Sequence, residues 1–383
     1  MSHPHPAPDR PTHVRWLPTG AQAFQRMLPA IDAATHSIRF EMYIYRADQI
    51  GDEFRATLIR AAKRKVRIQI LLDALGAGGL SDDYWNELRS HGGDVRIFNP
   101  LSFRGFLFRD HRKLLVIDDH LAFVGGFNVA DEYNGDGVTH GWCDLGWELT
   151  RPDAVAQLAA GFDTIFRAYD LRHQLLHRMK RPLRGSHPRS SHGPVLLGGP
   201  RLMKNPFGTS LLRAMQHAKC VQLISGYFVP NRRLRHALRR LARQGATVEI
   251  LLAGKSDVPI AQRAARSLYG PMLRAGVKIY EYQPQILHAK LAVVDDAVFV
   301  GSANLDIRSF GINYELMVRV DHPQVAAEAR ELFATHLRQS VLITFRDWQK
   351  NRSWLTRLRG HLAFFFFTKI DPWLVRRALR GIA

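Results

Sequence analysis

The pattern His-x-Lys-x-x-x-x-Asp occurs twice in this chain, as His111-Lys113-Asp118 and as His288-Lys290-Asp295. Each copy lies in an apolar run that ends in a small-residue turn followed by asparagine: HRKLLVIDDHLAFVGGFN and HAKLAVVDDAVFVGSAN. One copy could arise by chance, whereas two copies in matching context indicate one shared site. Two histidines backed by two lysines are the groups needed to cleave and remake a phosphodiester.

The motif residues divide this chemistry between them. One imidazole can attack phosphorus while a second protonates the leaving oxygen, because histidine titrates near neutral pH. Residues two apart in a strand share a face, so each lysine should point with its histidine. The lysines, with amide donors from Asn128 and Asn304, can bind the phosphate oxygens on which charge develops. No cage of carboxylates for magnesium or zinc is evident, so we expect no metal and no other cofactor.

Four carboxylates accompany the motifs. Asp118 and Asp295 fall where each strand turns back, and we expect them to be mainly structural, with some electrostatic effect on the site. A reactive imidazole also needs a carboxylate on its other nitrogen. Asp144 lies downstream of the first motif and Glu315 downstream of the second. We expect these two to orient the histidines, with Asp144 serving formation of the covalent intermediate.

The elements around the motifs repeat in order. Strand-like runs at 37–45, 66–72 and 94–98, separated by helical stretches at 52–63 and 82–90, precede the first motif. Runs at 220–229, 247–254 and 273–282, with a basic helix at 232–245, precede the second. This alternation predicts an α/β fold of two homologous α/β/α halves. Each half should have a mixed, mostly parallel sheet flanked by helices, and the halves should pack with pseudo-twofold symmetry that brings both motifs to one interface.

The repeat also predicts the domain boundaries. Residues 1–15 form a disordered lead-in, 16–179 the first half and 195–345 the second half. The basic, Pro- and Ser-containing segment 180–194 is the linker, and 346–383 form a C-terminal tail.

Composition limits the setting. The net charge of +20 over 383 residues indicates an anionic partner, either nucleic acid or an acidic membrane surface. Two cysteines, Cys143 and Cys220, cannot form a disulfide framework and suggest a reducing compartment. The N-terminus lacks the pattern of a signal peptide, and no apolar run approaches the roughly 20 residues needed to cross a bilayer. If the protein meets a membrane, we therefore expect contact from one side.

The twin motifs, with GG-x-N and GS-x-N after them, resemble the phospholipase D superfamily over residues 16–345. FNVADEYNG (127–135) with the Trp-Cys-Asp at 142–144, and SANLDIRSFGINYE (302–315), resemble bacterial cardiolipin synthases of a short type without transmembrane helices. The resemblance implies that His111 is the nucleophile and that His288 is the general acid and then the base. It also implies that the two lysines and two asparagines hold the phosphate. The motifs alone do not decide which histidine attacks.

The first copy departs from the superfamily at Gly126, where serine is common. This difference implies that the first half binds phosphate in a slightly different way.

The resemblance implies phosphatidyl transfer between two phosphatidylglycerol molecules, which yields cardiolipin and glycerol through a phosphatidyl-histidine. Two alternatives stay open: a phospholipase D-type hydrolase or nuclease, for which the basic helix 232–245 could track phosphates, and a non-catalytic binding protein. Intact residues in both motifs argue against the last of these.

The tail bears on the membrane question. Four phenylalanines (364–367) and several tryptophans alternate with basic residues, and Asp371-Pro372 can begin a final basic helix at 373–381. Such segments lie in the interface of anionic phospholipid membranes, here containing phosphatidylglycerol and cardiolipin. We expect peripheral association with the cytoplasmic side of the cell membrane; a helix pair packed on the domain is the alternative.

Overall fold

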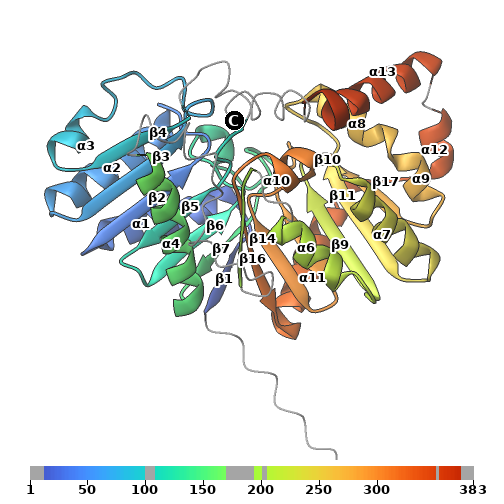
Figure 1. Ribbon diagram of the computed structural model, residues 1–383, viewed down its shortest axis with the longest axis horizontal. Coiled ribbons are helices and arrows are strands. Elements are labelled where there is room, and N and C mark those ends of the chain that lie inside the picture. The colour runs from blue at the N-terminus through green and yellow to red at the C-terminus, as the bar shows by residue number, and fades with distance from the viewer. Residues whose placement is uncertain (1–12, 100–107, 170–193, 201–204, 351–352, 372–383) are drawn as a thin grey trace, which may run out of the picture.

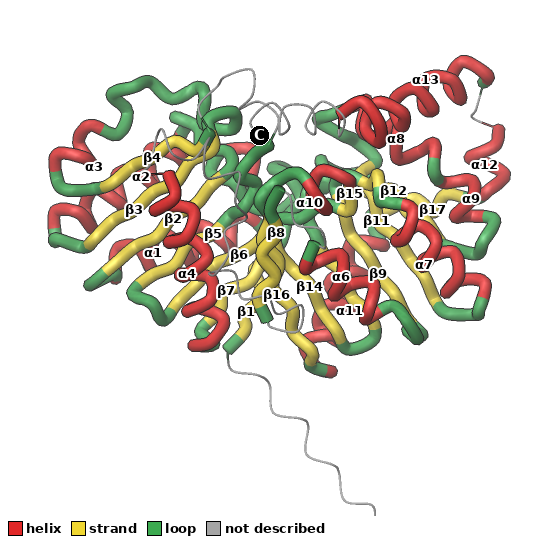
Figure 2. The backbone as a smooth tube through the Cα atoms, viewed as in Figure 1, coloured by secondary structure: helices red, strands yellow, loops and turns green. Residues whose placement is uncertain are grey.

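Two mixed β-sheets form the centre of the molecule, one from each half of the sequence (Figures 1 and 2). The computed structural model describes residues 13–99, 108–169, 194–200, 205–350 and 353–371. The lead-in up to residue 12, nearly all of the predicted linker and the predicted helix 373–381 lie outside these residues. The exact domain boundaries therefore stay predictions, except that the first strand begins at Val14, inside the predicted lead-in.

The first sheet has the strand order β1-β7-β6-β5-β2-β3-β4. Its strands are β1 (Val14–Leu17), β2 (Ser37–Met42), β3 (Arg67–Asp73), β4 (Asp94–Phe98), β5 (Leu114–Ile117), β6 (Leu121–Gly125) and β7 (Gly146–Leu149). Its helices are α1 (Gly20–Ala33), α2 (Gln49–Lys63), α3 (Asn86–Ser90) and α4 (Pro152–Tyr169), with a 3-10 turn, η2 (Asp131–Tyr133).

The second sheet has the order β17-β12-β11-β9-β13-β14-β16-β8. Its strands are β8 (Val195–Gly198), β9 (Cys220–Ser225), β11 (Thr247–Ala253), β12 (Lys278–Tyr282), β13 (Leu291–Val294), β14 (Ala297–Gly301), β16 (Glu315–Asp321) and β17 (Ser340–Ile343), and β10 (Phe228–Val229) pairs separately with β15 (Leu305–Asp306). Its helices are α6 (Pro206–Ala214), α7 (Arg232–Arg243), α8 (Pro259–Ser267), α9 (Tyr269–Leu273), α10 (Ile307–Gly311) and α11 (Pro323–Leu337).

The two strand orders are the same when the second is read from β8, apart from β17 at its far edge. The predicted α/β fold of two repeated halves is therefore confirmed. The prediction that most neighbouring strands pair in parallel is wrong. Four of six neighbouring pairs in the first sheet are antiparallel, as are five of seven in the second. Each motif lies on a hairpin followed by a return strand, so sequential strands reverse direction beside the parallel part.

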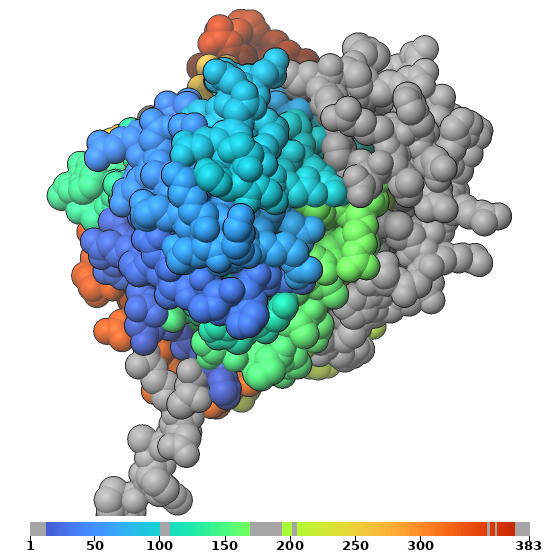
Figure 3. Space-filling model, turned by 90° about the vertical axis from the view of Figure 1, so that its left-hand side faces the viewer, coloured from blue at the N-terminus to red at the C-terminus, as the bar shows by residue number. Residues whose placement is uncertain are grey.

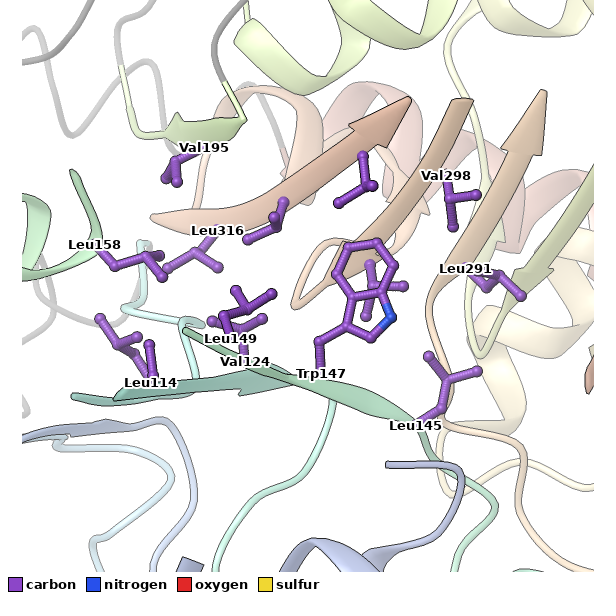
Figure 4. Close-up of a cluster of buried hydrophobic side chains, with 14 of the residues drawn as sticks. Leu114, Val124, Leu145, Trp147, Leu149, Leu158, Val195, Leu291, Val298 and Leu316 are labelled. Carbon is purple, nitrogen blue, oxygen red and sulfur yellow. The ribbon is translucent and has the colours of Figure 1, made fainter. Parts of the chain in front are cut away.

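The largest apolar cluster lies between the two sheets (Figure 4). Trp147 points from β7 towards the strands of the second half, where Val298 and Leu316 belong to the same cluster. α4 and α11 pack beside this interface, whereas α1 and α2 cover the outer face of the first sheet and α6 and α7 that of the second. The halves thus share one buried core, which fixes the two motifs relative to each other.

Three short helices follow the second sheet: α12 (Phe345–Lys350), α13 (Trp354–Phe365) and the π-helical turn η3 (Phe366–Ile370). α13 packs against α8 on the side of the molecule that carries β10 and α10 (Figure 1). In Figure 3, this segment (red) rises above the outline of the first half. No helix among the described residues has the length and apolar character needed to cross a bilayer.

Candidate active site

The motif histidines and lysines lie just before their strands rather than within them. β5 begins at Leu114 and β13 at Leu291, each three residues after its histidine. These approach segments pair across the halves: Asp110 bridges to Tyr314, and Leu287 bridges to Cys143. The His111 amide donates to Tyr314 O at 3.0 Å, and the His288 amide donates to Cys143 O at 2.8 Å. Each motif therefore lies beside the orienting carboxylate of the other half.

The histidine–carboxylate pairs are crossed between the halves. His111 Nδ1 lies 3.1 Å from both carboxylate oxygens of Glu315, and His288 Nδ1 lies 2.6 Å from Asp144 Oδ2. Both carboxylates do contact a motif histidine. The expectation that Asp144 serves formation of the intermediate stays a prediction, and through this contact Asp144 would act on His288 rather than on His111. Order along the chain suggested partners within one half, whereas the backbone bridges bring the partners from opposite halves.

The two carboxylates are held in different ways. Glu315 accepts hydrogen bonds from Ser302 Oγ at 2.5 Å and Ser309 Oγ at 2.8 Å. Asp144 accepts from the Leu145 amide at 2.8 Å. A Cβ at Gly126, the counterpart of Ser302, would lie 2.1 Å from Asp144 Oδ1. The glycine that departs from the superfamily thus leaves room for the Asp144 carboxylate.

Burial determines the charge states of these pairs. It lowers the pKa of His111 to about 4, although Glu315 opposes the shift. Burial and the charge of Lys290 likewise lower the pKa of His288 to about 4. Burial alone would raise the pKa values of Glu315 and Asp144, but the histidines and their other partners hold both below the usual range. At neutral pH, each neutral imidazole therefore donates Nδ1–H to an ionised carboxylate, which leaves the Nε2 lone pair as the reactive site.

The two lysines are buried beside the histidines in matching geometry. Lys113 Nζ donates to His111 O at 2.6 Å, and Lys290 Nζ donates to His288 O. Burial lowers the pKa of Lys113 to about 7 and that of Lys290 to about 8. An ammonium has three donors, so each lysine can still bind phosphate oxygens.

The asparagines differ from each other. Asn128 accepts from the Ile44 amide at 3.0 Å and donates to Tyr133 Oη at 2.7 Å. Its amide is thus partly committed within the first half. Asn304 keeps a buried Oδ1 without a hydrogen-bond partner in the described structure. Both asparagines line the same pocket as the histidines.

Asp118 and Asp295 lie at the opposite ends of β5 and β13 from the histidines, in the hairpin turns, with positive φ angles of 50° and 48°. Asp118 accepts from the backbone amides of residues 35, 36 and 37, at 2.8, 2.8 and 2.7 Å. Asp295 accepts from the Lys219 and Cys220 amides in the same way. These contacts tie each motif hairpin to its central strand, and they support the structural role over direct chemistry.

A pocket of about 320 Å³ contains the histidines. Several aromatic residues that the sequence analysis did not single out form its walls. The Tyr43 ring lies 4.9 Å from the His111 ring, and the Tyr133 and Trp142 rings lie 5.3 and 5.5 Å from the His288 ring. Position offers one signal that could have identified Tyr43, because it directly follows the central strand β2. Arg308 and Phe367 also line the pocket and were not predicted.

A buried charged cluster distinguishes the first half. Arg109 donates to Asp73 at 3.0 Å, Asp110 accepts from the Arg112 amide, and Arg112 Nη1 lies 3.9 Å from Glu41. Burial and the charge of Glu41 hold the pKa of Asp110 well above its usual value. The equivalent positions in the second half are apolar, and they are Ile224, Ala253, Ile286, Leu287 and Ala289.

Metal-ligand clusters, thiols and the basic helix α7 concern other kinds of site. Among the described residues, no group of three His, Cys, Asp or Glu side chains is arranged to hold a metal ion. Cys143 and Cys220 are free thiols. The basic helix α7 contributes none of the described residues that line the pocket.

A protein-family model described as "Cardiolipin synthase, PLD-like domain" matches residues 27–166 and 211–337. The chain is 32% identical over 360 residues to cardiolipin synthase 1 of Bacillus cereus, covering 90% of this chain and 70% of that protein. It is 30% identical over 376 residues to cardiolipin synthase B of Salmonella typhi, covering 94% and 90%.

Among solved structures, phosphatidylserine synthase of Haemophilus influenzae matches with a TM-score of 0.75 and 15% identity, covering 94% of each chain. Polyphosphate kinase of Porphyromonas gingivalis matches with a TM-score of 0.57 and 12% identity, covering 88% of this chain and 54% of that one. At these identities the likeness establishes the fold.

Proposed function

The chain belongs to the cardiolipin synthase family with phospholipase D-like domains, and we propose that it is a phosphatidyltransferase that makes cardiolipin from two phosphatidylglycerol molecules. The observation that carries this proposal is the reciprocal pairing of two buried imidazoles with carboxylates of the opposite half around one pocket. Such a pair supplies both a nucleophile and a proton donor without a resident cofactor.

In the first step, His111 Nε2 attacks the phosphorus of one phosphatidylglycerol. The bond from phosphorus to the glycerol oxygen breaks, and that oxygen takes a proton from His288. The phosphate anion raises the pKa of the nearby imidazole, so the proton is present in the substrate complex. Free glycerol and a phosphatidyl-His111 result.

In the second step, His288 takes the proton from a glycerol hydroxyl of a second phosphatidylglycerol. The hydroxyl oxygen attacks phosphorus and the bond to His111 breaks, which releases cardiolipin and regenerates both imidazoles. The lysine ammonium groups and the asparagine amides stabilise charge on the phosphate oxygens in both steps. The aromatic walls limit access of water, which would otherwise yield phosphatidic acid.

We also propose that α13 brings the pocket to an anionic membrane, on its cytoplasmic side. One face of α13 packs on α8 through Gly360 and Ala363. The other face exposes apolar side chains, with Leu362 at 59% and Phe365 at 53% exposure. Exposed Arg359 and Lys369 flank this apolar face. Apolar contact with flanking basic residues favours anionic lipid.

The run of four phenylalanines has both packed and exposed members. Phe364 and Phe367 are half-buried and pack beside Ala363, whereas Phe365 and Phe366 are exposed. Phe367 also lines the pocket. The segment therefore packs on the domain and presents an apolar surface beside the pocket, and we propose that its role is peripheral membrane association.

Lipid analysis by mass spectrometry tests the function. Purified protein and its His111→Ala and His288→Ala variants are incubated with phosphatidylglycerol vesicles, and circular dichroism checks their folds. Cardiolipin with free glycerol, lost in both variants, supports the transferase. Histidine-dependent phosphatidic acid would instead indicate a hydrolase. No lipid change would leave single-stranded and duplex DNA as the next substrates.

A further inference from the structure

The acceptor lipid in this reaction brings a second phosphate to the pocket. Its reacting hydroxyl and its own phosphodiester are carried by the same three-carbon glycerol, so both must lie close to the site. The two buried motif lysines are engaged with the donor phosphate in the proposed mechanism. An acceptor that is itself an anion needs another cation.

Arg308 has the position for this task. Among the described residues that line the pocket, it is the one lysine or arginine. It lies four residues after Asn304, at the start of α10, and its side chain is 27% exposed. A guanidinium retains its charge at every relevant pH and can bind a phosphate through two donors.

Two carboxylates also line the pocket and would repel an anion if left alone. Asp257 accepts from Tyr227 Oη at 2.7 Å, and Asp306 caps α10 by accepting from the Ser309 amide at 2.7 Å. Burial raises the pKa of Asp306 to about 6, so this carboxyl is still mostly ionised at neutral pH. Arg308 is therefore needed to make this wall attractive to a phosphate.

The C-terminal segment holds Arg308 in place. Arg308 Nη1 donates to Asp371 Oδ1 at 2.5 Å, and the Asp371 side chain is buried. Four residues earlier, Phe367 lines the pocket. The helical segment with the exposed apolar face thus also supplies one wall of the pocket and the carboxylate that orients its arginine.

We propose that Arg308 binds the phosphate of the acceptor phosphatidylglycerol and that Asp371 positions it. This inference rests on the proposed transferase function and adds a subsite that selects an alcohol carrying a phosphodiester over water or free glycerol. The charge of Arg308 makes the acceptor site specific, whereas the histidines and lysines act on whichever phosphatidyl group is transferred.

Glycerol exchange separates the acceptor site from the chemistry. Deuterated glycerol, which has no phosphate, can attack the phosphatidyl-histidine and return deuterated phosphatidylglycerol. Vesicles of phosphatidylglycerol with deuterated glycerol therefore report both acceptors in one sample, as the ratio of cardiolipin to deuterated phosphatidylglycerol. We expect Arg308→Gln to lower this ratio about tenfold or more, equivalent to about 1.4 kcal/mol, and Arg308→Lys to lower it less.

Asp371→Asn tests the positioning role. It should lower the ratio in the same direction by a smaller factor, and it should add nothing in the Arg308→Gln background. Arg243→Gln, which removes an exposed arginine at the end of α7, is the charge-matched control and should keep the wild-type ratio.

One result would overturn the subsite: an unchanged ratio in Arg308→Gln, whether both products keep their wild-type amounts or fall together in proportion. Absence of both products in the wild-type protein would instead contradict the proposed transferase. The two failures are therefore distinguishable.

Discussion

The Glu315 side chain is one methylene longer than the Asp144 side chain, and the residues around the two carboxylates differ accordingly. The longer Glu315 reaches His111 and receives two serine hydroxyls, whereas the shorter Asp144 reaches His288 across the space left by Gly126. Each pair keeps the Nδ1 of its imidazole occupied. Both pairs use the same nitrogen of the imidazole, so the separate roles of the two histidines must be distinguished by kinetics.

Leaving-group dependence distinguishes the two carboxylates. We expect Glu315→Gln and Asp144→Asn each to slow transfer from phosphatidylglycerol on the order of 10²-fold or more, because each change disturbs the tautomer of one histidine. A p-nitrophenol leaving group needs no proton. Formation of the intermediate from phosphatidyl-p-nitrophenol should therefore recover in Asp144→Asn but not in Glu315→Gln, measured as the p-nitrophenol burst. Equal recovery in both variants would contradict the division of roles.

Acid should destabilise the protein through the same histidines. Their pKa values are about 4 in the folded protein and about 6.5 when unfolded. The unfolded chain therefore binds protons first as the pH falls, so this stability is complete above about pH 6.5 and is lost as the pH approaches 4. Melting temperatures measured across this range should fall more steeply for the wild-type protein than for a His111→Gln/His288→Gln variant. Parallel curves would show that folding does not lower the pKa values of these imidazoles.

At the scale of elements, the sequence predicts the positions of several strands well. The strands at 67–73, 94–98 and 247–253 lie within one residue of their expected positions, because continuous apolar runs between turn residues are distinctive. The hairpins at Asp118 and Asp295 were also predicted, because aspartate is favoured in turns. The excess of antiparallel pairs was missed, since periodicity identifies a strand but not the direction of its neighbour.

The sequence alone could not predict the crossed histidine–carboxylate pairs or the buried charged cluster. Asp144 and Glu315 could be nominated, but their partners depend on backbone bridges between the halves. Glu41 lies in a strand that reads as apolar and aromatic, and nothing local links it with Arg112. Comparison of equivalent positions in the two halves would have revealed this asymmetry, provided the register of the repeat were known.

The charged cluster should contribute to stability as a unit. Arg112→Ala leaves Glu41 and Asp110 buried without their cation, and we expect a loss of about 3 kcal/mol of unfolding free energy in denaturant titrations. The matched variant Glu41→Ile/Asp110→Leu/Arg112→Ala copies the residues of the second half and should recover part of that loss. A loss below about 1 kcal/mol in Arg112→Ala would show that the cluster is not coupled.

At the scale of the whole molecule, two features are related to the pocket: the core shared by the two sheets and the exposed apolar face of α13. The core fixes two half-sites into one pocket, and the C-terminal segment, whose Phe367 lines that pocket, exposes apolar side chains. A soluble substrate would not require such a surface. Under the proposed membrane role, this surface contacts the bilayer while the head group of a lipid enters the pocket.

Vesicle sedimentation tests the membrane role of α13. We expect Leu358→Glu/Leu362→Glu to weaken binding to phosphatidylglycerol vesicles at least about tenfold, because two leucines lose apolar burial and gain charges of the wrong sign. The control is Val341→Glu/Leu342→Glu, which alters two similarly exposed residues on the edge strand β17. Equal binding by both variants would demote α13 to a packing element.

Identification of the phosphatidylated residue tests the central claim most directly. The His288→Ala variant is given phosphatidyl-p-nitrophenol, which needs no acid to form the intermediate, while breakdown lacks its base. Intact-protein mass spectrometry followed by peptide mapping should find one phosphatidyl group on His111. A phosphatidyl group on a residue other than His111, or p-nitrophenol release with no covalent adduct, would contradict the mechanism.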